Sequence, residues 1–347
     1  MPAKTNIEGQ VQMKATLNIN TVLLICASIA LLPFVFGTCL CFGTVFISPL
    51  DYLRDNHGLG VIIDLRSQRL LAGFIVGGSL AVSGAAYQAV LRNPLAEPFI
   101  LGISGGAGLG AAISIAFGFT ALGYLFLPFF SFLSALLVLS LVLVMARGAG
   151  SEYANNIMLS GVVAGTLCSS VLMFIISVLD NHKLNSVTWW MLGNLEQGNS
   201  ALLHAAGIAA VAGTVILFHY GREINALTLG DEMAFYLGVN SRTLLLAVLG
   251  IASLLTAAAV SISGIIGFVG LVIPHILRRL FGADHRRLFP LSFLYGGMFL
   301  MVCDTFAKTV LSPREIPVGV ITSLVGGPFF IWLLNRKSAR LGSGGDS

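Results

Sequence analysis

The chain has 347 residues, of which 56% are hydrophobic and only 10% are charged, and its mean hydropathy is +0.91. Because soluble domains carry about 25% charged residues, this composition excludes an ordinary soluble protein and indicates a polytopic membrane protein. The formal net charge of +4 comes from basic residues that gather beside apolar runs, which is a signal of membrane topology and not of nucleic-acid binding.

Apolar runs of about 20 residues predict membrane-spanning helices, since barrel strands are shorter and alternate in polarity. We expect an all-α membrane protein with about ten transmembrane helices in a single membrane domain, residues 21–336. The expected spans are Thr21–Ile47, Arg69–Leu91, two between Phe99 and Ala146 with a break near Gly118–Gly123, Ile157–Leu179, Ala201–Tyr220, Thr243–Ile262, Gly264–Leu280, Arg286–Lys308 and Val318–Leu334.

The tails at residues 1–20 and 337–347 are expected to lie in the cytoplasm. The first apolar run is too long for the apolar part of a cleaved signal peptide, so it is expected to remain as the first span. The eighth span contains Pro274 and several glycines, which predicts a broken or short helix.

Three polar segments separate the early spans. The segment Ser48–Leu65 is expected to be a loop, and Arg92–Pro98 is a tight break because its two prolines cannot continue a helix. A second polar loop, Asp180–Asn199, contains Trp189 and Trp190, and adjacent tryptophans at the end of a span suggest an interfacial segment.

A mostly polar, loop-like stretch runs over Gly221–Asn240, with the sequence GREINALTLGDEMAFYLGVN. Its pattern predicts two short helices, Glu223–Leu229 and Asp231–Leu237, separated by Gly230 and closed by Gly238. Two acidic residues begin the second helix, where they favour its dipole. The segment is either a solvated loop or a docking surface for a cytoplasmic partner.

The positive-inside rule orients the ten spans. With both termini in the cytoplasm, the cytoplasmic side carries 13 basic residues and the outer side carries 6. The cytoplasmic set is Lys4, Lys14, Arg92, Arg147, Arg222, Arg242, Arg278, Arg279, Arg286, Arg287, Arg336, Lys337 and Arg340, and the outer set is Arg54, Arg66, Arg69, Lys183, Lys308 and Arg314. This topology makes Gly221–Asn240 cytoplasmic.

The predicted spans contain few residues that could bind a metal, transfer a proton or catalyse a reaction. Asp304 lies four residues before Lys308, which predicts an ion pair near the outer end, with a proton relay as the alternative. The pair Cys39 and Cys41 has no nearby histidine to complete a metal site, and His275 at a helix break is expected to be structural. The sequence contains no P-loop and no catalytic constellation, so we expect no catalytic residue, no metal and no cofactor on this chain, with energy supplied from elsewhere.

Three places are candidates for a function. Arg66 and Arg69 lie at the outer mouth of the second span, on one helical face, and either snorkel to the interface or bind an acidic partner. The turn Asn93–Leu95 is either a connector or a gate, and Gly221–Asn240 is the third candidate.

Four motifs occur in an order that resembles the FecCD family of permease subunits of bacterial ABC importers for iron-siderophores, haem and vitamin B12. The motifs cover residues 66–336 and are Arg66…Arg69-Leu70-Leu71-Ala72…Gln88…Arg92-Asn93-Pro94-Leu95-Ala96-Glu97-Pro98…Leu101-Gly102-Ile103-Ser104-Gly105-Gly106-Ala107, Leu227-Thr228-Leu229-Gly230-Asp231…Leu237-Gly238-Val239, Gly267-Phe268-Val269-Gly270-Leu271-Val272-Ile273-Pro274-His275…Arg278, and Glu315-Ile316-Pro317-Val318-Gly319…Gly326-Gly327-Pro328-Phe329-Phe330. Gln68 and Ile265 stand where the family often has proline.

The resemblance implies a type II ABC importer permease fold in a bacterial cytoplasmic membrane. It implies a dimer of two copies or of two paralogues, a cytoplasmic ATPase pair that holds ATP and Mg²⁺, and a periplasmic or lipid-anchored binding protein. It places binding-protein docking at Arg66, Arg69 and Lys308 and the cytoplasmic gate at Asn93, Pro94 and Leu95. ATPase coupling would fall on Leu227, Leu229, Gly230, Asp231, Glu232, Leu237 and Gly238.

The function that the resemblance implies is import of a ferric siderophore or a similar metal chelate, driven by ATP. Haem, cobalamin or molybdate are alternatives for the same machinery. From another class, an ion-coupled secondary carrier stays open, with Asp304 as its only support.

Overall fold

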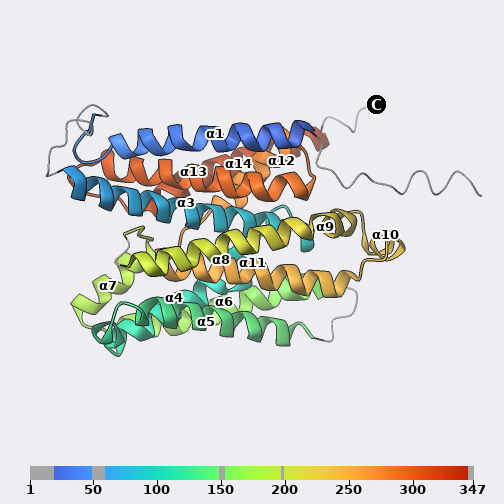
Figure 1. The fold of residues 1–347 in the computed structure, drawn as a ribbon. Helices are drawn as coiled ribbons and strands as arrows, with labels where there is room; N and C mark the ends of the chain where they lie inside the picture. The colour runs from blue at the N-terminus through green and yellow to red at the C-terminus, as the bar shows by residue number, and fades with distance from the viewer. Residues whose placement is uncertain (1–18, 49–58, 148–152, 197–198, 343–347) are drawn as a thin grey trace, which may run out of the picture.

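The computed structural model describes residues 19–48, 59–147, 153–196 and 199–342, and every regular element in these ranges is a helix (Figure 1). This confirms the predicted all-α class. The α-helices are α1 (Ile19–Cys41), α3 (Leu59–Val90), α4 (Ile103–Ala116), α5 (Phe126–Met145), α6 (Tyr153–Val178), α7 (Asn181–Met191), α8 (Ser200–His219), α9 (Gly221–Thr228), α10 (Asp231–Tyr236), α11 (Ser241–Ser263), α12 (Val269–Phe281), α13 (His285–Thr309) and α14 (Val318–Gly342).

Seven helices among the described residues are long and apolar enough to cross a membrane, namely α1, α3, α5, α6, α8, α11 and α13. Two shorter apolar helices, Ile103–Ala116 and Val318–Leu333, lie at two of the other expected spans. The tenth is α12, which has 13 residues and contains Pro274, as expected of a short or broken helix. Each of the ten expected spans therefore corresponds to a helix of the structure.

Helix α3 forms the centre of the fold. It packs against α13, α11, α12, α8 and α1, and 89% of its most apolar window is buried inside the protein. By contrast, only 22% of the corresponding window of α6 is buried, so α6 lies at the edge. An α-helix whose whole circumference is covered must be apolar or small on all sides, which describes the run from Leu70 to Val90.

Small residues allow the helices around α3 to approach closely. A Cβ atom on Gly77 would overlap the carbonyl oxygen of Gly296 in α13, and one on Gly84 would overlap the carbonyl oxygen of Gly270 in α12. Membrane helices associate through such backbone approaches because lipid provides no hydrophobic drive between them.

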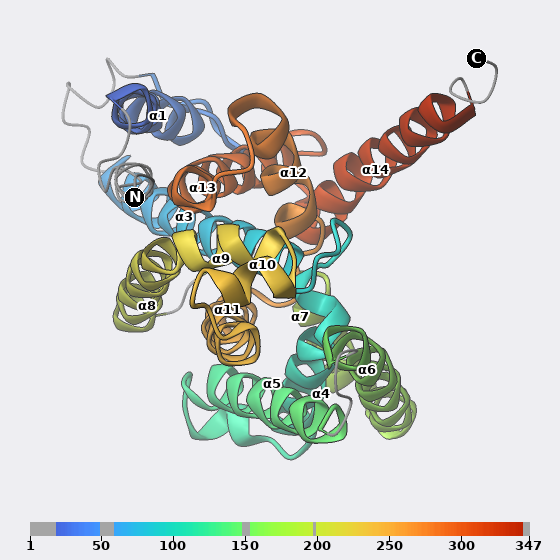
Figure 2. The same cartoon turned by 90° about the vertical axis from the view of Figure 1, so that its right-hand side faces the viewer.

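The long helices run side by side between two ends of the bundle (Figure 1). Helix α7 lies at one end, which we call the α7 end, and α9 and α10 lie at the other, which we call the α9–α10 end. Figure 2 looks onto the α9–α10 end, where α9 and α10 cross over α3 and α11, and α14 projects away from the other helices. The two ends present different chemistry.

Several predicted boundaries were wrong. Helix α3 begins at Leu59 and not at Arg69, because charged residues end an apolar run without ending a helix. The expected loop Asp180–Asn199 contains α7, whose first turn is capped by the carboxylate of Asp180 accepting a hydrogen bond from the backbone N–H of Lys183. Helix α1 ends at Cys41, before the expected Ile47.

The expected tails are only partly within the described residues. Helix α14 continues to Gly342, beyond the boundary predicted at residue 336. The predicted tail at residues 1–20 lies almost entirely outside the described residues, as does the end of the second tail at residues 343–347.

Candidate functional site

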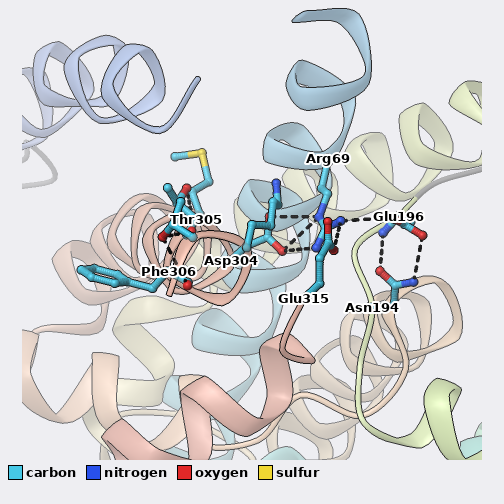
Figure 3. Close-up of polar contacts among 10 residues, drawn as sticks. Arg69, Asn194, Glu196, Asp304, Thr305, Phe306 and Glu315 are labelled. Atoms are coloured by element: carbon cyan, nitrogen blue, oxygen red, sulfur yellow. Dashed lines mark hydrogen bonds and ion pairs between the residues drawn. The ribbon is translucent and has the colours of Figure 1, made fainter. Parts of the chain in front are cut away.

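A cluster of five charged side chains lies at the α7 end, and we call it the Asp304 cluster (Figure 3). It consists of Arg69 from α3, Asp304 and Lys308 from α13, Glu196 from the segment after α7, and Glu315 from the segment before α14. Two cations thus meet three carboxylates that come from distant parts of the chain.

Arg69 is the hub of the cluster. Its Nε lies 3.1 Å from both carboxylate oxygens of Asp304, and its Nη2 lies 3.0 Å from Oδ1. Its Nη1 donates to Glu315 at 2.9 Å and to Glu196 at 3.3 Å. On the other side of Asp304, Lys308 Nζ lies 2.7 Å from Oδ2. This confirms the predicted ion pair between Asp304 and Lys308.

The cluster is buried at its centre and open at its rim. The side chain of Asp304 is 1% exposed, and those of Arg69 and Lys308 are each 11% exposed. Glu315 and Glu196 are 40% and 66% exposed. Buried charges are tolerated when they are paired and hydrogen-bonded, which is the state of Asp304 here.

Arg66 does not share the environment of Arg69, although both lie on α3. The guanidinium of Arg66 donates to the backbone carbonyls of Leu40 at 3.0 Å and Val45 at 2.7 Å, at the end of α1 and just beyond it. The sequence places the two arginines on one helical face, but in the structure their side chains turn to different neighbours. Docking at Arg66, Arg69 and Lys308 stays a prediction.

The turn predicted as a gate follows α3 at the α9–α10 end. The side-chain Oδ1 of Asn93 accepts a hydrogen bond from the backbone N–H of Leu95 at 2.9 Å, which closes an Asx turn around Pro94. Pro94 and Leu95 are exposed, while Asn93 is half-buried. A short turn with exposed tips at the end of the central helix is well placed to act as a gate, and this role stays a prediction.

The predicted pair of short helices in Gly221–Asn240 is confirmed as α9 and α10. Gly230 separates them with φ of 117° and ψ of 158°, a conformation open essentially only to glycine. Gly238 follows α10 with φ of 78°, as expected for a residue that ends a helix. Leu227 is buried and attaches α9 to the bundle, so it does not contribute to the exposed surface.

Helix α10 and its flanks expose large apolar side chains at the α9–α10 end. We call this group the α10 surface, and its members are Leu229 (66% exposed), Met233 (49%), Phe235 (77%), Tyr236 (78%) and Leu237 (57%). Asp231 and Glu232 are exposed beside it. Large exposed apolar side chains with acidic side chains near them in the sequence make α10 a candidate surface for binding another protein.

An arginine that sequence reasoning did not single out as a site joins the turn to the α9–α10 segment. Arg92 Nη2 and Nη1 lie 2.7 Å and 3.0 Å from the two carboxylate oxygens of Asp231, and its Nε donates to the carbonyl of Leu227 at 3.1 Å. The hydrogen bonds from Arg92 hold the pKa of Asp231 below its usual range.

Glu97 is a second residue that was missed as a site. Its Oε1 accepts a hydrogen bond of 2.7 Å from the backbone N–H of Phe268, the residue immediately before α12. Phe268 has φ of 68°, so the carboxylate holds an unusual backbone conformation in place. Both Arg92 and Glu97 stand in the first quoted motif, yet their partners are 139 and 171 residues away, and no local pattern reveals such pairs.

The remaining candidates have ordinary surroundings. His275 lies in α12 with its ring 6.3 Å from that of Phe329 in α14. Cys39 is buried and Cys41 is half-buried. Among the described residues, no group of three or more histidine, cysteine, aspartate or glutamate side chains is arranged to hold a metal ion.

Comparison with known proteins places the chain in one family. The model of the FecCD transport family matches residues 30–336. The hemin transport system permease protein HmuU of Yersinia pestis is 38% identical over 278 residues, covering 79% of this chain and 83% of the relative. The cobalamin import system permease protein BtuC of Halobacterium salinarum is 37% identical over 295 residues, covering 85% of this chain and 79% of the relative.

A solved structure agrees with these relatives. The chain superposes with a TM-score of 0.80 on an inward-facing conformation of a metal-chelate type ABC transporter, at 30% identity, covering 91% of this chain and 99% of the other. Four motifs, ten helices in the expected order and these comparisons lead to one assignment: the chain belongs to the FecCD transport family.

Proposed function

We propose that this chain is the membrane permease subunit of an ABC importer that moves a metal chelate into the cytoplasm, driven by ATP hydrolysis on partner subunits. The family and the relatives support the class of transporter. The observation that carries the proposal is the α10 surface, because it offers a docking site where a cytoplasmic ATPase would be needed.

The α10 surface suits an ATPase better than lipid. It lies on two short helices beyond the ends of the long ones, next to exposed acidic side chains, where a lipid tail could not cover it (Figure 1). Stable protein interfaces have an apolar centre rich in aromatic residues and a polar rim. Phe235 and Tyr236 would supply that centre, and Glu232 would form part of the rim.

The distribution of basic residues supports the orientation. The predicted topology assigns 13 basic residues to the cytoplasmic side, which includes α9 and α10, and 6 to the outer side, so the positive-inside rule favours a cytoplasmic position for α9, α10 and both termini. The α7 end then faces the outside of a bacterial cytoplasmic membrane. Cysteines introduced at Tyr124, at the α7 end, and at Tyr236 test this: in intact cells an impermeant thiol reagent should label the first above the level of the parent chain and leave the second at that level.

The α7 end would receive a substrate-binding protein. Arg66, Arg69 and Lys308 are the candidate docking residues. Acidic side chains of the binding protein would have to compete with acids of this chain for Arg69 and Lys308, and with backbone carbonyls for Arg66. In the Asp304 cluster the exposed acids Glu196 and Glu315 are the ones that a partner could displace. Buried Asp304 would stay in place and hold Arg69 toward the surface.

The substrate class follows the relatives. HmuU is named as a hemin transport permease and BtuC as a cobalamin import permease, and the matched structure is described as a metal-chelate type transporter. We propose a ferric siderophore or a similar metal chelate for this chain, released to the cytoplasm past the turn Asn93–Leu95. A second copy of the chain, or a paralogue, would complete the pathway.

An ion-coupled carrier fits the structure less well. Such carriers use a buried acid whose charge changes during transport. Asp304 is the buried acid that the sequence suggested, and its carboxylate is already ion-paired with both Arg69 and Lys308. ATP on a partner removes the need for such a relay.

The test replaces one aromatic side chain of the α10 surface. Phe235→Asp should abolish co-purification of the ATPase from native membranes, because it places a charge at the centre of the apolar surface. The matched control is Tyr124→Asp, which changes an exposed aromatic residue at the α7 end and should leave co-purification unchanged. Normal recovery of the ATPase with Phe235→Asp would overturn the proposed docking surface.

The substrate is tested with the assembled complex in proteoliposomes. Hemin, cobalamin, a ferric siderophore and molybdate are offered with ATP inside the vesicles. Uptake of a chelate that requires ATP supports the proposal, and uptake of molybdate alone contradicts the substrate class. Uptake that needs an ion gradient and proceeds without ATP would overturn the importer itself.

A further inference from the structure

Arg92 occupies an unusual position between the central helix and the turn. It follows the last residues of α3 and immediately precedes Asn93, and its φ of 48° lies in the left-handed region. A residue other than glycine pays for this conformation and keeps it only where neighbouring contacts hold it. The contacts of the Arg92 side chain therefore help to hold its backbone conformation, and this conformation sets the direction in which the chain enters the turn.

Those contacts reach both helices of the α9–α10 segment. The bidentate pair with Asp231 binds the first residue of α10, and the bond from Nε to the carbonyl of Leu227 binds the end of α9. The two attachment points lie on opposite sides of Gly230. A guanidinium held at three nitrogens by two groups has a fixed orientation, which a single ammonium could not reproduce.

The packing around α10 makes this contact important. Helix α9 packs directly against α3 and α13, whereas α10 packs mainly against α9 with a smaller contact with α11. Ala234 is the buried residue of α10, and its larger apolar side chains face outward. Asp231 and Arg92 thus connect α10 directly to the end of α3. A displacement of α10 would therefore act on the end of α3 through this polar contact.

We propose that Arg92 is the positioning residue that transmits movement of α10 to the turn Asn93–Leu95. This inference rests on the proposed function, in which an ATPase moves α10. When α10 shifts, Asp231 draws the guanidinium with it, and the backbone of Arg92 changes its φ. Because Asn93 is the next residue, that change re-aims the turn. The Asx turn within Asn93–Leu95 lets the three residues move as a unit.

Because Arg92 and Asp231 are both partly exposed, they can be substituted without disturbing the folded core. The side chains of Arg92 and Asp231 are 37% and 64% exposed, so neutral substitutions leave no buried charge and the variants should fold. The variants are Arg92→Gln, Asp231→Asn and the two combined. The control is Arg222→Gln, which removes an exposed cation from α9 at the same end.

The complex with its ATPase and binding protein is purified and placed in proteoliposomes. Three quantities are measured, namely recovery of the ATPase, the rate of ATP hydrolysis, and substrate moved per ATP. Arg92→Gln and Asp231→Asn should keep the first two and lower substrate per ATP by about fivefold or more, the usual lower range for a coupling between sites. The double variant should lose no more than either single one, because both remove one interaction. Arg222→Gln should match the parent.

The possible outcomes distinguish a failure of this inference from a failure of the proposed function. If the parent imports substrate with ATP and both single variants stay within about twofold of its substrate per ATP, Arg92 does not couple and only this inference fails. If the variants lose the ATPase, the pair serves docking and the coupling role is wrong. A parent complex without ATP-dependent import overturns the proposed function together with this inference.

Discussion

The carboxylate of Asp304 accepts three hydrogen bonds from the guanidinium of Arg69, although the two residues are 235 positions apart in the chain. The contact joins α3 to α13, the helix that packs most extensively on it. Lys308 occupies the other side of the same carboxylate. One buried acid is therefore paired with two nearly buried cations at the α7 end.

Replacing Asp304 with alanine should destabilise the protein strongly. The change leaves Arg69 and Lys308 close together without their buried counter-charge, and breaking a buried pair in this way costs about 3–5 kcal/mol. The measurement is thermal unfolding of the purified chain in detergent. Glu196→Gln is the control, because Glu196 is 66% exposed and its pair with Arg69 should contribute less than about 1 kcal/mol. Equal shifts for the two variants would show that burial does not govern the cluster.

The helices could be predicted from the sequence because their signals are local. Runs without charge mark the spans, and Gly230 and Gly238 mark α9 and α10 within a residue or two. Helix α7 was missed because its polar sequence resembles a loop, although Asp180 is a recognisable capping residue. The early start of α3 was missed because Asp64 and Arg66 interrupt the apolar run that marks the span, although the helix itself continues through them.

The sites could be predicted only in part. Asp304 and Lys308 are one helical turn apart, so their ion pair can be predicted from the sequence. The partners that Arg69 finds in Glu196 and Glu315 come from segments 127 and 246 residues away, and only the fold brings them together. For this reason the sequence left Arg69 either to snorkel to the interface or to bind an acidic partner, whereas the structure pairs it with acids of the same chain.

The exposed acids of the cluster should compete with a docking partner. Glu315→Gln replaces the nearer of the two anions on Nη1 of Arg69 with a neutral amide, which a carboxylate of the binding protein can displace more easily. We expect the affinity of the binding protein for the assembled transporter in nanodiscs to rise several-fold. Asp64→Asn removes an acid at the same end that bonds Gln68 and not Arg69, so it controls for the general loss of negative charge. If the affinity rises equally in both variants, the cause is the general loss of negative charge and not competition for Arg69.

Gly230 should not tolerate a side chain. Its backbone conformation is disfavoured for other residues by about 1–3 kcal/mol, even though a Cβ atom there would meet no neighbour. Gly230→Ala should therefore lower thermal stability or shift α10, and it should speed proteolysis within residues 221–240. The control is Gly250→Ala, inside α11 with open space and ordinary helical backbone, where the change should be neutral or stabilising by up to about 1 kcal/mol. Matching behaviour of the two alanine variants would contradict the strained junction.

The contact between Arg92 and Asp231 should persist throughout the physiological pH range. The hydrogen bonds from Arg92 lower the pKa of Asp231 in the folded protein, so their contribution is fully present above the unfolded value of about 3.9 and is lost only as pH falls through the lower folded value. We therefore expect the ratio of substrate moved per ATP between the parent and Asp231→Asn to be the same at pH 8 and at about pH 5.5. Using the ratio per ATP cancels the pH dependence of the ATPase. A ratio that falls toward one within this range would mean that Asp231 is protonated there, and the hydrogen bonds from Arg92 could not then be the dominant influence on its carboxylate.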